Sequence, residues 1–211
     1  MRIVLLGPPA SGKGTQGRRL AASLGLGYLS TGALLRENIE NGTALGLAAE
    51  PILARGGYLP DGLICPIVAD WLVANDAVSG WVLDGFPRSL RQAEFLDAWL
   101  LEKGVTLGAA VALEVPFAEL LRRIQDRVEC PDCRWSGQGA DLPEPGKCPK
   151  CGGDAAPRAD DSEANFRNRH AEFLSLTVPV IDFYRETGRL VPVPATGTKD
   201  ETAATILSSF A

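Results

Sequence analysis

A glycine-rich stretch near the N-terminus holds residues whose types and spacing can do chemistry. Residues 7–15 read Gly-Pro-Pro-Ala-Ser-Gly-Lys-Gly-Thr and follow the apolar run Ile3–Leu6. The spacing G-x-x-x-x-G-K is typical of a loop whose backbone N–H groups surround a phosphate while the lysine, Lys13, reaches further phosphate oxygens. It departs from the general motif because Gly14 follows the lysine and the hydroxyl comes one residue later, at Thr15. The sequence therefore predicts a nucleotide-binding protein.

A carboxylate and a guanidinium follow a second apolar run. Asp84 comes directly after Trp81–Leu83, and Arg88 follows a Gly-Phe-Pro turn. A phosphate-binding loop of this kind needs an acid at the end of a neighbouring strand to hold Mg²⁺ through water, and Asp84 is the candidate. Arg88 is placed to reach a phosphate beyond the carboxyl end of the strand.

Four of the five cysteines form two pairs with the spacing of a zinc ribbon. Cys130 and Cys133 are followed, after fourteen residues, by Cys148 and Cys151. Two such pairs complete a tetrahedron of thiolates, and because all four ligands come from the protein, the zinc is expected to be structural. Disulfides are the alternative, but a cytoplasmic chain keeps its thiols reduced. The fifth cysteine, Cys65, has no partner in the pattern and is expected to be a buried small hydrophobic residue.

The elements that must position these residues have an α/β rhythm. Strand-like runs are Ile3–Leu6, Trp81–Leu83, Ala109–Val115 and Leu190–Val193, and helix-like segments cover 13–24, 31–40, 61–75, 89–102, 117–128, 161–186 and 200–209. Strands that alternate with helices predict a parallel sheet covered by helices. Pro179 is expected to bend or interrupt the sixth helix.

Two stretches do not fit this rhythm. Residues 30–59 are helical with no strong strand between, and residues 129–159 are rich in Cys, Pro, Gly and Asp. Both are interpreted as insertions into a nucleotide-binding core.

Composition indicates a compact intracellular enzyme. The 211 residues are 45% hydrophobic and 22% charged, enough for one good core. The formal net charge of −5 argues against a broad surface for nucleic acid or anionic membrane. The apolar run after Arg2 is too short for a signal peptide, and the expected location is the cytoplasm.

Taken together, the motifs resemble those of a known family. In order and spacing, GPPASGKGTQ at 7–16, STGALLR at 30–36, DGFPRSLRQA at 84–93, the paired CPxC sequences at 130–151 and PRADD at 157–161 are similar to those of adenylate kinases of the long-lid, zinc-containing kind. The resemblance covers essentially the whole chain. It implies the reaction ATP + AMP = 2 ADP with Mg²⁺, in the service of adenine nucleotide homeostasis.

The resemblance also implies a fold and a domain organisation. The fold is a parallel sheet of the P-loop NTPase type flanked by helices, with two insertions. A core of residues 1–29, 60–125 and 164–211 would carry an AMP-binding segment, 30–59, and a zinc-ribbon-like lid, 126–163. The chain is expected to be a monomer that binds ATP, AMP and ADP, with no nucleic acid or membrane partner.

Site residues follow from the resemblance position by position. ATP would be bound by Gly7, Ala10, Ser11, Gly12, Lys13, Gly14, Thr15, Arg127, Ser136, Gly137 and Lys199. AMP would be bound by Thr31, Arg36, Gly57, Tyr58, Leu59, Gly85, Phe86, Pro87, Arg88, Gln92, Arg158 and Arg169. The catalytic set would be Lys13, Arg88, Arg123, Arg127, Arg158 and Arg169.

This set of cations fits the implied chemistry. Phosphoryl transfer between two polyanions depends on positioning and charge neutralisation, so it needs no protein nucleophile. Arg123 and Arg127 are four residues apart and are expected to share one face of the helix 117–128. Arg122 and Arg167 are expected to project elsewhere as solvated or ion-paired side chains. Asp160 and Asp161 could cap the helix that follows them or pair with lid arginines.

Three positions depart from the family's pattern. Ala10 stands where a glycine is frequent, and Ala33 stands where an aspartate is frequent. In the lid, Ser136-Gly137 takes the place of a hydroxyl residue followed by an aromatic one, with Trp135 displaced.

Two other functions stay open on the sequence alone. The first is a kinase of similar architecture that uses GTP as donor or another nucleoside monophosphate as acceptor. The second is a P-loop ATPase or switch with a zinc-ribbon interaction module. A non-enzymatic zinc protein that binds nucleic acid is opposed by the acidic charge balance.

Overall fold

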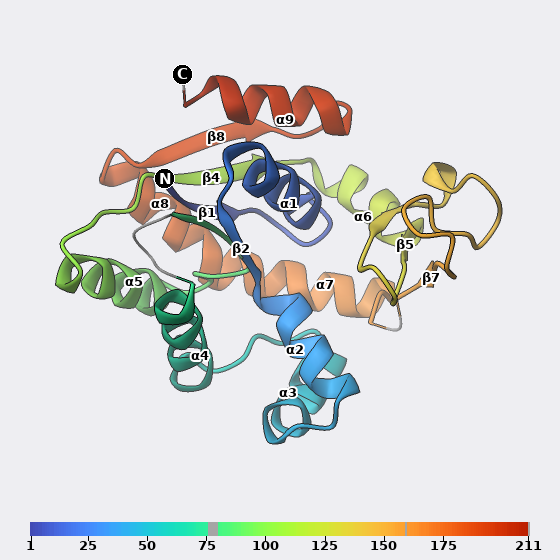
Figure 1. Cartoon of the computed structure of the whole chain (residues 1–211), viewed down its shortest axis with the longest axis horizontal. Coiled ribbons are helices and arrows are strands. Elements are labelled where there is room, and N and C mark those ends of the chain that lie inside the picture. The colour runs from blue at the N-terminus through green and yellow to red at the C-terminus, as the bar shows by residue number, and fades with distance from the viewer. Residues whose placement is uncertain (76–79, 159, 211) are drawn as a thin grey trace.

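The centre of the molecule is a five-stranded parallel sheet (Figure 1). The computed structural model describes residues 1–75, 80–158 and 160–210. In sheet order, the strands are β2 (Gly27–Ser30), β3 (Trp81–Asp84), β1 (Arg2–Leu6), β4 (Ala109–Glu114) and β8 (Leu190–Pro194). All four strand pairs are parallel, so the carboxyl ends of the strands lie along one edge.

Helices cover both faces of this sheet. The side chains of β1 alternate: Ile3 and Leu5 pack with residues of α1 (Lys13–Leu24) and α9 (Lys199–Ser208). Val4 and Leu6 pack on the opposite face, with residues of α4 (Asp61–Ala74), α5 (Leu90–Glu102) and α8 (Val178–Glu186). A strand buried on both faces is apolar throughout, which explains the continuous run Ile3–Leu6. The predicted fold class, a parallel sheet flanked by helices, is confirmed.

Most predicted elements are present, and one strand of the five-stranded sheet was missed. The β2 strand is only four residues long and includes a glycine and a serine, so its sequence carries little strand signal. The expected interruption of the helix 161–186 is confirmed. The chain forms α7 (Glu163–Glu172), a π-helical turn η2 (Phe173–Thr177) and then α8, with Pro179 in the first turn of α8. In the described ranges, no helix is long and apolar enough to cross a membrane.

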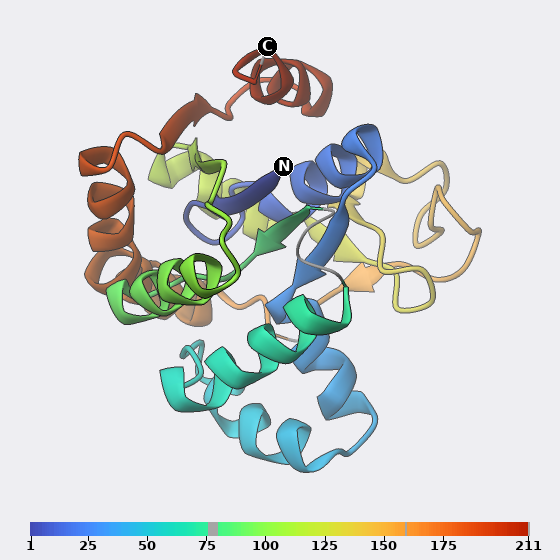
Figure 2. The same ribbon diagram turned by 60° about the vertical axis from the view of Figure 1, so that its left-hand side comes forward.

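Two helices lie beyond the carboxyl end of β2, and we call them the α2–α3 segment. They are α2 (Thr31–Glu40) and α3 (Ala44–Ala54), which pack closely on each other. In Figure 2 this segment lies at the bottom of the view, on the far side of the molecule from α9.

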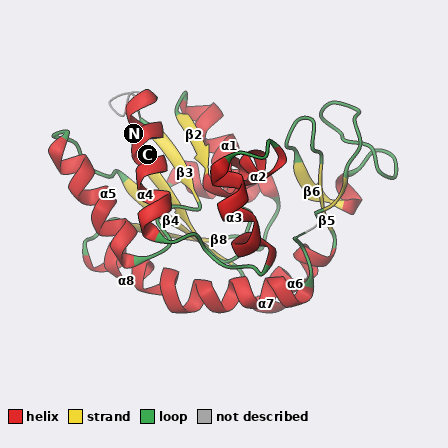
Figure 3. Cartoon of the chain, turned by 90° about the horizontal axis from the view of Figure 1, so that it is seen from below, coloured by secondary structure: helices red, strands yellow, loops and turns green. Residues whose placement is uncertain are grey.

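A second segment lies between α6 (Phe117–Gln125) and α7, and we call it the three-stranded segment. It consists of β5 (Arg127–Glu129), β6 (Ser136–Gln138), a 3₁₀ turn η1 (Gly139–Asp141) and β7 (Ala156–Pro157). The strands form an antiparallel sheet in the order β6-β5-β7. Figure 3 shows β5 and β6 at the opposite end of the molecule from α5.

The helix predicted over 117–128 is wrong at its C-terminal end. The α6 helix ends at Gln125, and Asp126 caps it with a backbone hydrogen bond to Arg122. Arg127 therefore lies on β5, where it pairs with Gln138, and does not share a helix face with Arg123. Pairing in the small sheet outweighed the local helical pattern, as tertiary context commonly does.

Candidate active site

One cavity of about 910 Å³ is bounded by the sheet edge, the α2–α3 segment and the three-stranded segment. It collects nearly every site residue predicted from the sequence. The predicted residues that line it are Gly7, Ala10, Ser11, Gly12, Lys13, Gly14, Thr15, Thr31, Arg36, Gly57, Tyr58, Leu59, Asp84, Gly85, Pro87, Arg88, Gln92, Arg123, Arg127, Ser136, Gly137, Arg158, Arg169 and Lys199. Phe86 is instead fully buried in the core beneath the cavity.

The loop between β1 and α1 has a backbone shaped for an anion. Gly7 has φ 143°, and a Cβ there would lie 2.9 Å from the backbone oxygen of Leu113, so no larger residue fits. Gly12 (φ 96°) and Ala10 (φ 64°) are also left-handed. Ala10 accepts this conformation at a cost of about 1 kcal/mol relative to glycine. The α1 helix begins at Lys13, so its free N–H groups and positive dipole end point into the cavity.

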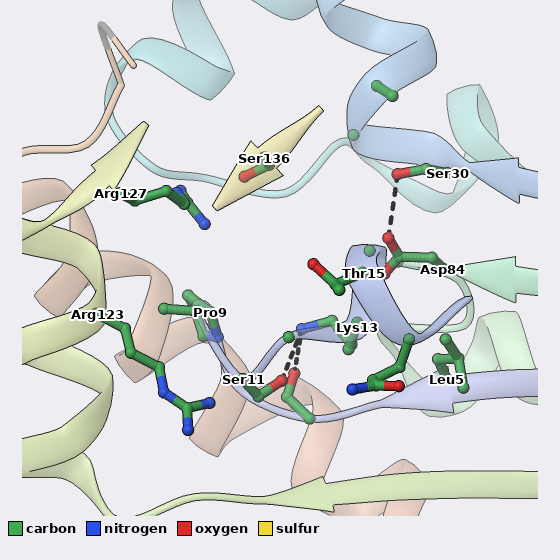
Figure 4. Close-up of a pocket in the computed structure, with 18 of the residues that line it drawn as sticks. Leu5, Pro9, Ser11, Lys13, Thr15, Ser30, Asp84, Arg123, Arg127 and Ser136 are labelled. Carbon is green, nitrogen blue, oxygen red and sulfur yellow. Dashed lines mark hydrogen bonds between the residues drawn. The ribbon is translucent and has the colours of Figure 1, made fainter. Parts of the chain in front are cut away.

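Lys13 folds back over this loop. Its Nζ donates hydrogen bonds to the carbonyl oxygens of Gly7 and Pro8, both at 2.8 Å, and lies 3.5 Å from the Oγ of Ser11 (Figure 4). Burial lowers the pKa of Lys13 to about 8; Asp84 opposes the shift, and nearby arginines add to it. The ammonium group thus lies in a site that disfavours its charge until an anion arrives.

We expect triphosphate binding to be coupled to proton uptake by Lys13. In the empty protein this lysine loses its proton as the pH rises through about 8, below its ordinary pKa. A bound phosphate raises that pKa, so above pH 8 binding takes up a proton and affinity falls with increasing pH. Calorimetric titrations at pH 8.5 in buffers of different ionisation enthalpy measure this uptake. Uptake of the same size in Lys13→Met would contradict the assignment.

Asp84 lies at the carboxyl end of β3, next to the glycine-rich loop between β1 and α1. The residue is 8% exposed, and its Oδ2 accepts hydrogen bonds from the hydroxyls of Tyr28, at 3.1 Å, and Ser30, at 3.2 Å. Burial and the nearby Asp84 carboxylate raise the pKa of Tyr28, which stays a donor. Figure 4 shows the Asp84 carboxylate facing the cavity between Ser30 and Thr15. The arrangement fits a carboxylate that holds a magnesium ion through water.

A second group of polar residues lies beyond Asp84. The buried Thr31 donates a hydrogen bond from its Oγ1 to the carbonyl of Gly85, at 3.0 Å, and the Nε of Arg88 donates to the same oxygen, at 2.8 Å. The Arg88 guanidinium stacks over the Tyr58 ring, 4.2 Å from its centre. Gln92 accepts the backbone N–H of Arg88 at 2.7 Å. These contacts fix one guanidinium at the second end of the cavity.

The first turn of α2 is also open to an anion. Ser30, the N-cap residue, makes no side-chain capping hydrogen bond, because its hydroxyl donates to Asp84 instead. Arg36, one turn further along, faces the cavity. Burial and the neighbouring Arg158 lower the pKa of Arg36 to about 10. Two guanidiniums this close favour a shared anionic ligand.

Three arginines between the two ends of the cavity form ion pairs with acidic side chains. Arg127 forms an ion pair with Asp161, and Arg158 and Arg169 both pair with Asp160, at 3.0 and 2.5 Å. Of the two expectations for these aspartates, pairing is confirmed. Capping of the following helix is wrong, because Ser162 is the N-cap of α7 and accepts a hydrogen bond from the backbone of Asn165.

Ion pairs join the three-stranded segment to α2. Arg134 makes two hydrogen bonds with Glu40, at 3.0 and 2.5 Å. One turn earlier on α2, Arg36 lies 3.9 Å from Glu129. Glu129, a half-buried acid among arginines, could not be predicted from the sequence, because a single charged residue in a short strand carries no motif.

Arg123 lies at the first end of the cavity. It donates hydrogen bonds to Glu119 and to the carbonyl oxygen of Ala195, both at 2.8 Å. Arg122 and Arg167 are ion-paired and solvated, as expected. They pair with Glu119 and Glu163, with side chains 60% and 57% exposed. Arg122 nevertheless lines the cavity, so the expectation that it projects elsewhere is wrong for this residue, whereas Arg167 does not line the cavity.

The four cysteines of the two pairs come together at the tip of the three-stranded segment. Their sulfur atoms all lie within 4.8 Å of one another, with Cys130 and Cys151 at 3.6 Å and Cys133 and Cys148 at 3.5 Å. Thiolates around a tetrahedral zinc ion are about 3.8 Å apart, so the cluster fits this metal. Cys65 is buried in the main core, and burial raises the pKa of its thiol to about 11.

Fold and site define the class of the protein. The cavity combines a glycine-rich loop before a helix, an acid at the end of a strand and a second end lined by arginines. These are the parts of a phosphotransferase that transfers a phosphoryl group between two phosphorylated substrates. The adenylate kinase family model matches residues 5–189, and the chain belongs to the adenylate kinase family.

Curated relatives cover nearly the whole chain. An adenylate kinase of Thermodesulfovibrio yellowstonii is 41% identical over 95% of this chain and 94% of its own length. An adenylate kinase of Moorella thermoacetica is 42% identical over 90% of this chain and 88% of its own length. An adenylate kinase of the archaeon Archaeoglobus fulgidus is 40% identical over 95% of this chain and 92% of its own length.

Proposed function

We propose that this protein transfers the γ-phosphoryl group of magnesium-bound ATP to AMP, reversibly, to give two ADP. The bond from the γ-phosphorus to the β–γ bridging oxygen breaks as a phosphate oxygen of AMP bonds to the γ-phosphorus. The observation that carries the proposal is a single cavity with two separate anion-binding ends. One end is the loop that bears Lys13, and the other holds Arg36 and Arg88.

The roles proposed for the residues follow this division. The loop from Gly7 to Thr15, with Arg127, Ser136, Gly137 and Lys199, binds ATP. The α2–α3 segment and the residues around Arg88 bind AMP, with Tyr58 and its neighbours along the base. Arg123 at the first end and the arginines between the two ends, Arg127, Arg158 and Arg169, neutralise the transferring group, and binding releases those that now pair with acidic side chains.

Two metals belong to the proposal. Asp84 holds Mg²⁺ through water, and Mg²⁺ supplies positive charge to the β- and γ-phosphates. The four clustered cysteines hold a structural Zn²⁺, which leaves no coordination position for chemistry. We further propose a monomeric, cytoplasmic enzyme with a core of 1–29, 60–125 and 164–211, an AMP-binding segment, 30–59, and a lid, 126–163. Ala159, within that lid, lies outside the described residues.

A coupled assay for ADP tests this function. With ATP and Mg²⁺ present, we expect rapid ADP formation only when AMP is added, because transfer needs the second anion site filled. Two ADP should form for each ATP consumed. ATP consumption that is independent of AMP would instead support a P-loop ATPase. A panel of donors and acceptors separates the adenylate kinase from a kinase that uses GTP or another nucleoside monophosphate.

A molecule that joins two adenosines through five phosphates provides an independent check. It should bind far more tightly than ATP, since one ligand fills both ends of the cavity at a single cost in translational and rotational entropy. Affinity no greater than that of ATP would argue against two adjoining nucleotide sites.

A further inference from the structure

The end of the cavity nearest α9 is polar. It is bounded by residues 195–198, by Lys199 at the start of α9 and by the η1 turn of the three-stranded segment. In the sheet, β1 and the glycine-rich loop after it lie between β3, which leads to Arg88, and β8, which leads to residues 195–198. The base of the donor nucleotide therefore extends from this loop towards the α9 end, away from Arg88. Among the described residues, the only aromatic side chain that lines the cavity is Tyr58, and its ring lies against Arg88.

Gly137 shows why no ring projects here from β6. A Cβ at this position would lie 2.5 Å from the ring of Trp135 and 2.6 Å from the Oδ2 of Asp141, so the space is already taken. Trp135 itself packs against the cysteine cluster, with Cys130 and Cys148. Base recognition at this end therefore depends on hydrogen bonds rather than on stacking with an aromatic side chain.

A lid carboxylate and a core ammonium group meet at this end. The Nζ of Lys199 donates to the Oδ2 of Asp141 at 2.6 Å, and the backbone N–H of Gln138 donates to the same oxygen at 2.6 Å. The other carboxylate oxygen, Oδ1, makes no hydrogen bond to the described residues, and because the side chain is 33% exposed this oxygen is accessible to a ligand. Although burial raises the pKa of Asp141, these hydrogen bonds outweigh it and lower the pKa, so the group is ionised at neutral pH.

The amide of Gln16 provides a buried acceptor that has no partner at this end of the described structure. Gln16 is 4% exposed, lines the same cavity and donates from Nε2 to the backbone oxygen of Lys199 at 2.9 Å. Its Oε1 is buried with no partner in the described chain. Buried acceptors without partners are rare and costly, which indicates that a ligand supplies N–H groups at this end.

We propose that Asp141 is a specificity-determining residue for the donor nucleotide: its Oδ1 accepts a hydrogen bond from the exocyclic amino group of the base. Lys199 is the positioning residue that holds the carboxylate, and its ammonium group can donate to the adjacent ring nitrogen. A neighbouring acceptor and donor match the amino group and ring nitrogen on the edge of adenine. The inference rests on the proposed function and names how its donor site selects a base.

The alternative is a purely structural role, in which the Lys199–Asp141 pair only ties the lid to α9. A structural tie affects every donor equally. A contact with the base affects only donors that carry the amino group. The two roles therefore predict different ratios of kcat/KM between ATP and a donor that lacks this group.

The test compares ATP with purine riboside 5′-triphosphate, which has no exocyclic amino group, with AMP as acceptor throughout. A hydrogen bond to a charged acceptor is worth about 1.5–3 kcal/mol, so the wild type should prefer ATP by about tenfold to hundredfold. Asp141→Ala should lose this preference, because kcat/KM for ATP falls while that for the analogue stays within about twofold. Asp141→Asn keeps an acceptor oxygen and should retain an intermediate preference, and it serves as well if the alanine variant does not fold.

Asp154→Ala is the matched control. Asp154 is a lid aspartate that pairs with Lys147 at 2.8 Å, and neither residue lines the cavity. It should keep the wild-type preference. Equal losses of kcat/KM for both donors in Asp141→Ala, or no preference for ATP in the wild type, would overturn this inference but not the proposed function. Absence of AMP-dependent ADP formation from either donor by the wild type would instead overturn the proposed function.

Discussion

Replacing Lys13 with methionine should lower kcat by roughly a hundredfold to a thousandfold or more, with little change in thermal stability. The expected loss of about 3–4 kcal/mol is typical when one preorganised charge that stabilises a transition state is removed. Methionine keeps the apolar stem, so the loop loses the hydrogen bonds that the Nζ makes with Gly7 and Pro8 and its longer contact with Ser11. Steady-state kinetics with saturating ATP and AMP, together with a melting curve, measure both quantities.

Arg167→Ala is the control for this measurement. Arg167 is also a cation close in sequence to a proposed catalytic residue, Arg169, but it pairs with Glu163 on the surface of α7 and does not line the cavity. Exposed pairs of this kind contribute little to stability. A kcat close to that of the wild type is expected. If Lys13→Met kept most of its activity, or if Arg167→Ala were equally damaging, the assignment of the charges that act on the phosphoryl group would be wrong.

The parts of the fold that sequence predicted best are those with a strong local signal. The strand β1 is buried on both faces and so reads as a continuous apolar run, and the glycine spacing that follows it reflects backbone angles that other residues rarely adopt. The position of the turn between β1 and α1 could therefore be predicted from the glycine spacing. The cysteine cluster was predicted equally well, since two closely spaced pairs leave few arrangements that satisfy four thiolates.

What sequence could not predict are contacts that join distant segments. Arg127 was placed on a helix because residues 117–128 have a helical pattern, yet pairing with β6 and β7 draws it into a strand. The ion pair between Arg134 and Glu40 joins two inserted segments that are 94 positions apart in the chain. The contact between Asp141 and Lys199 is another example, because Lys199 belongs to a helix near the other end of the sequence. No periodicity or motif in the sequence predicts such contacts between distant residues.

Removal of zinc should loosen the lid before any other part of the protein. The lid has little core of its own: the buried residues of its cluster are Cys130, Cys148 and Ala155. Zinc binding to four thiolates contributes on the order of 10 kcal/mol to folding of a segment that cannot otherwise bury enough apolar surface. We therefore expect one Zn²⁺ per chain. After chelation, amide hydrogen exchange should rise first in residues 126–163, and the melting temperature should fall.

Matched cysteine substitutions separate the metal site from general effects of losing a thiol. Cys130→Ser should lower both the metal content and the melting temperature, yet keep substantial activity at low temperature, because the closed ligand set leaves zinc no part in the chemistry. Cys65→Ser makes the same chemical change in the main core and should leave the metal content unchanged.

Because the ligands must be deprotonated, zinc should be released as the pH falls. Freshly purified protein with four reactive thiols in residues 130–151 and no metal would refute the site. Complete inactivity of a metal-free protein whose lid stays protected from hydrogen exchange would refute a purely structural role, because zinc would then have to act directly on the transferring phosphoryl group.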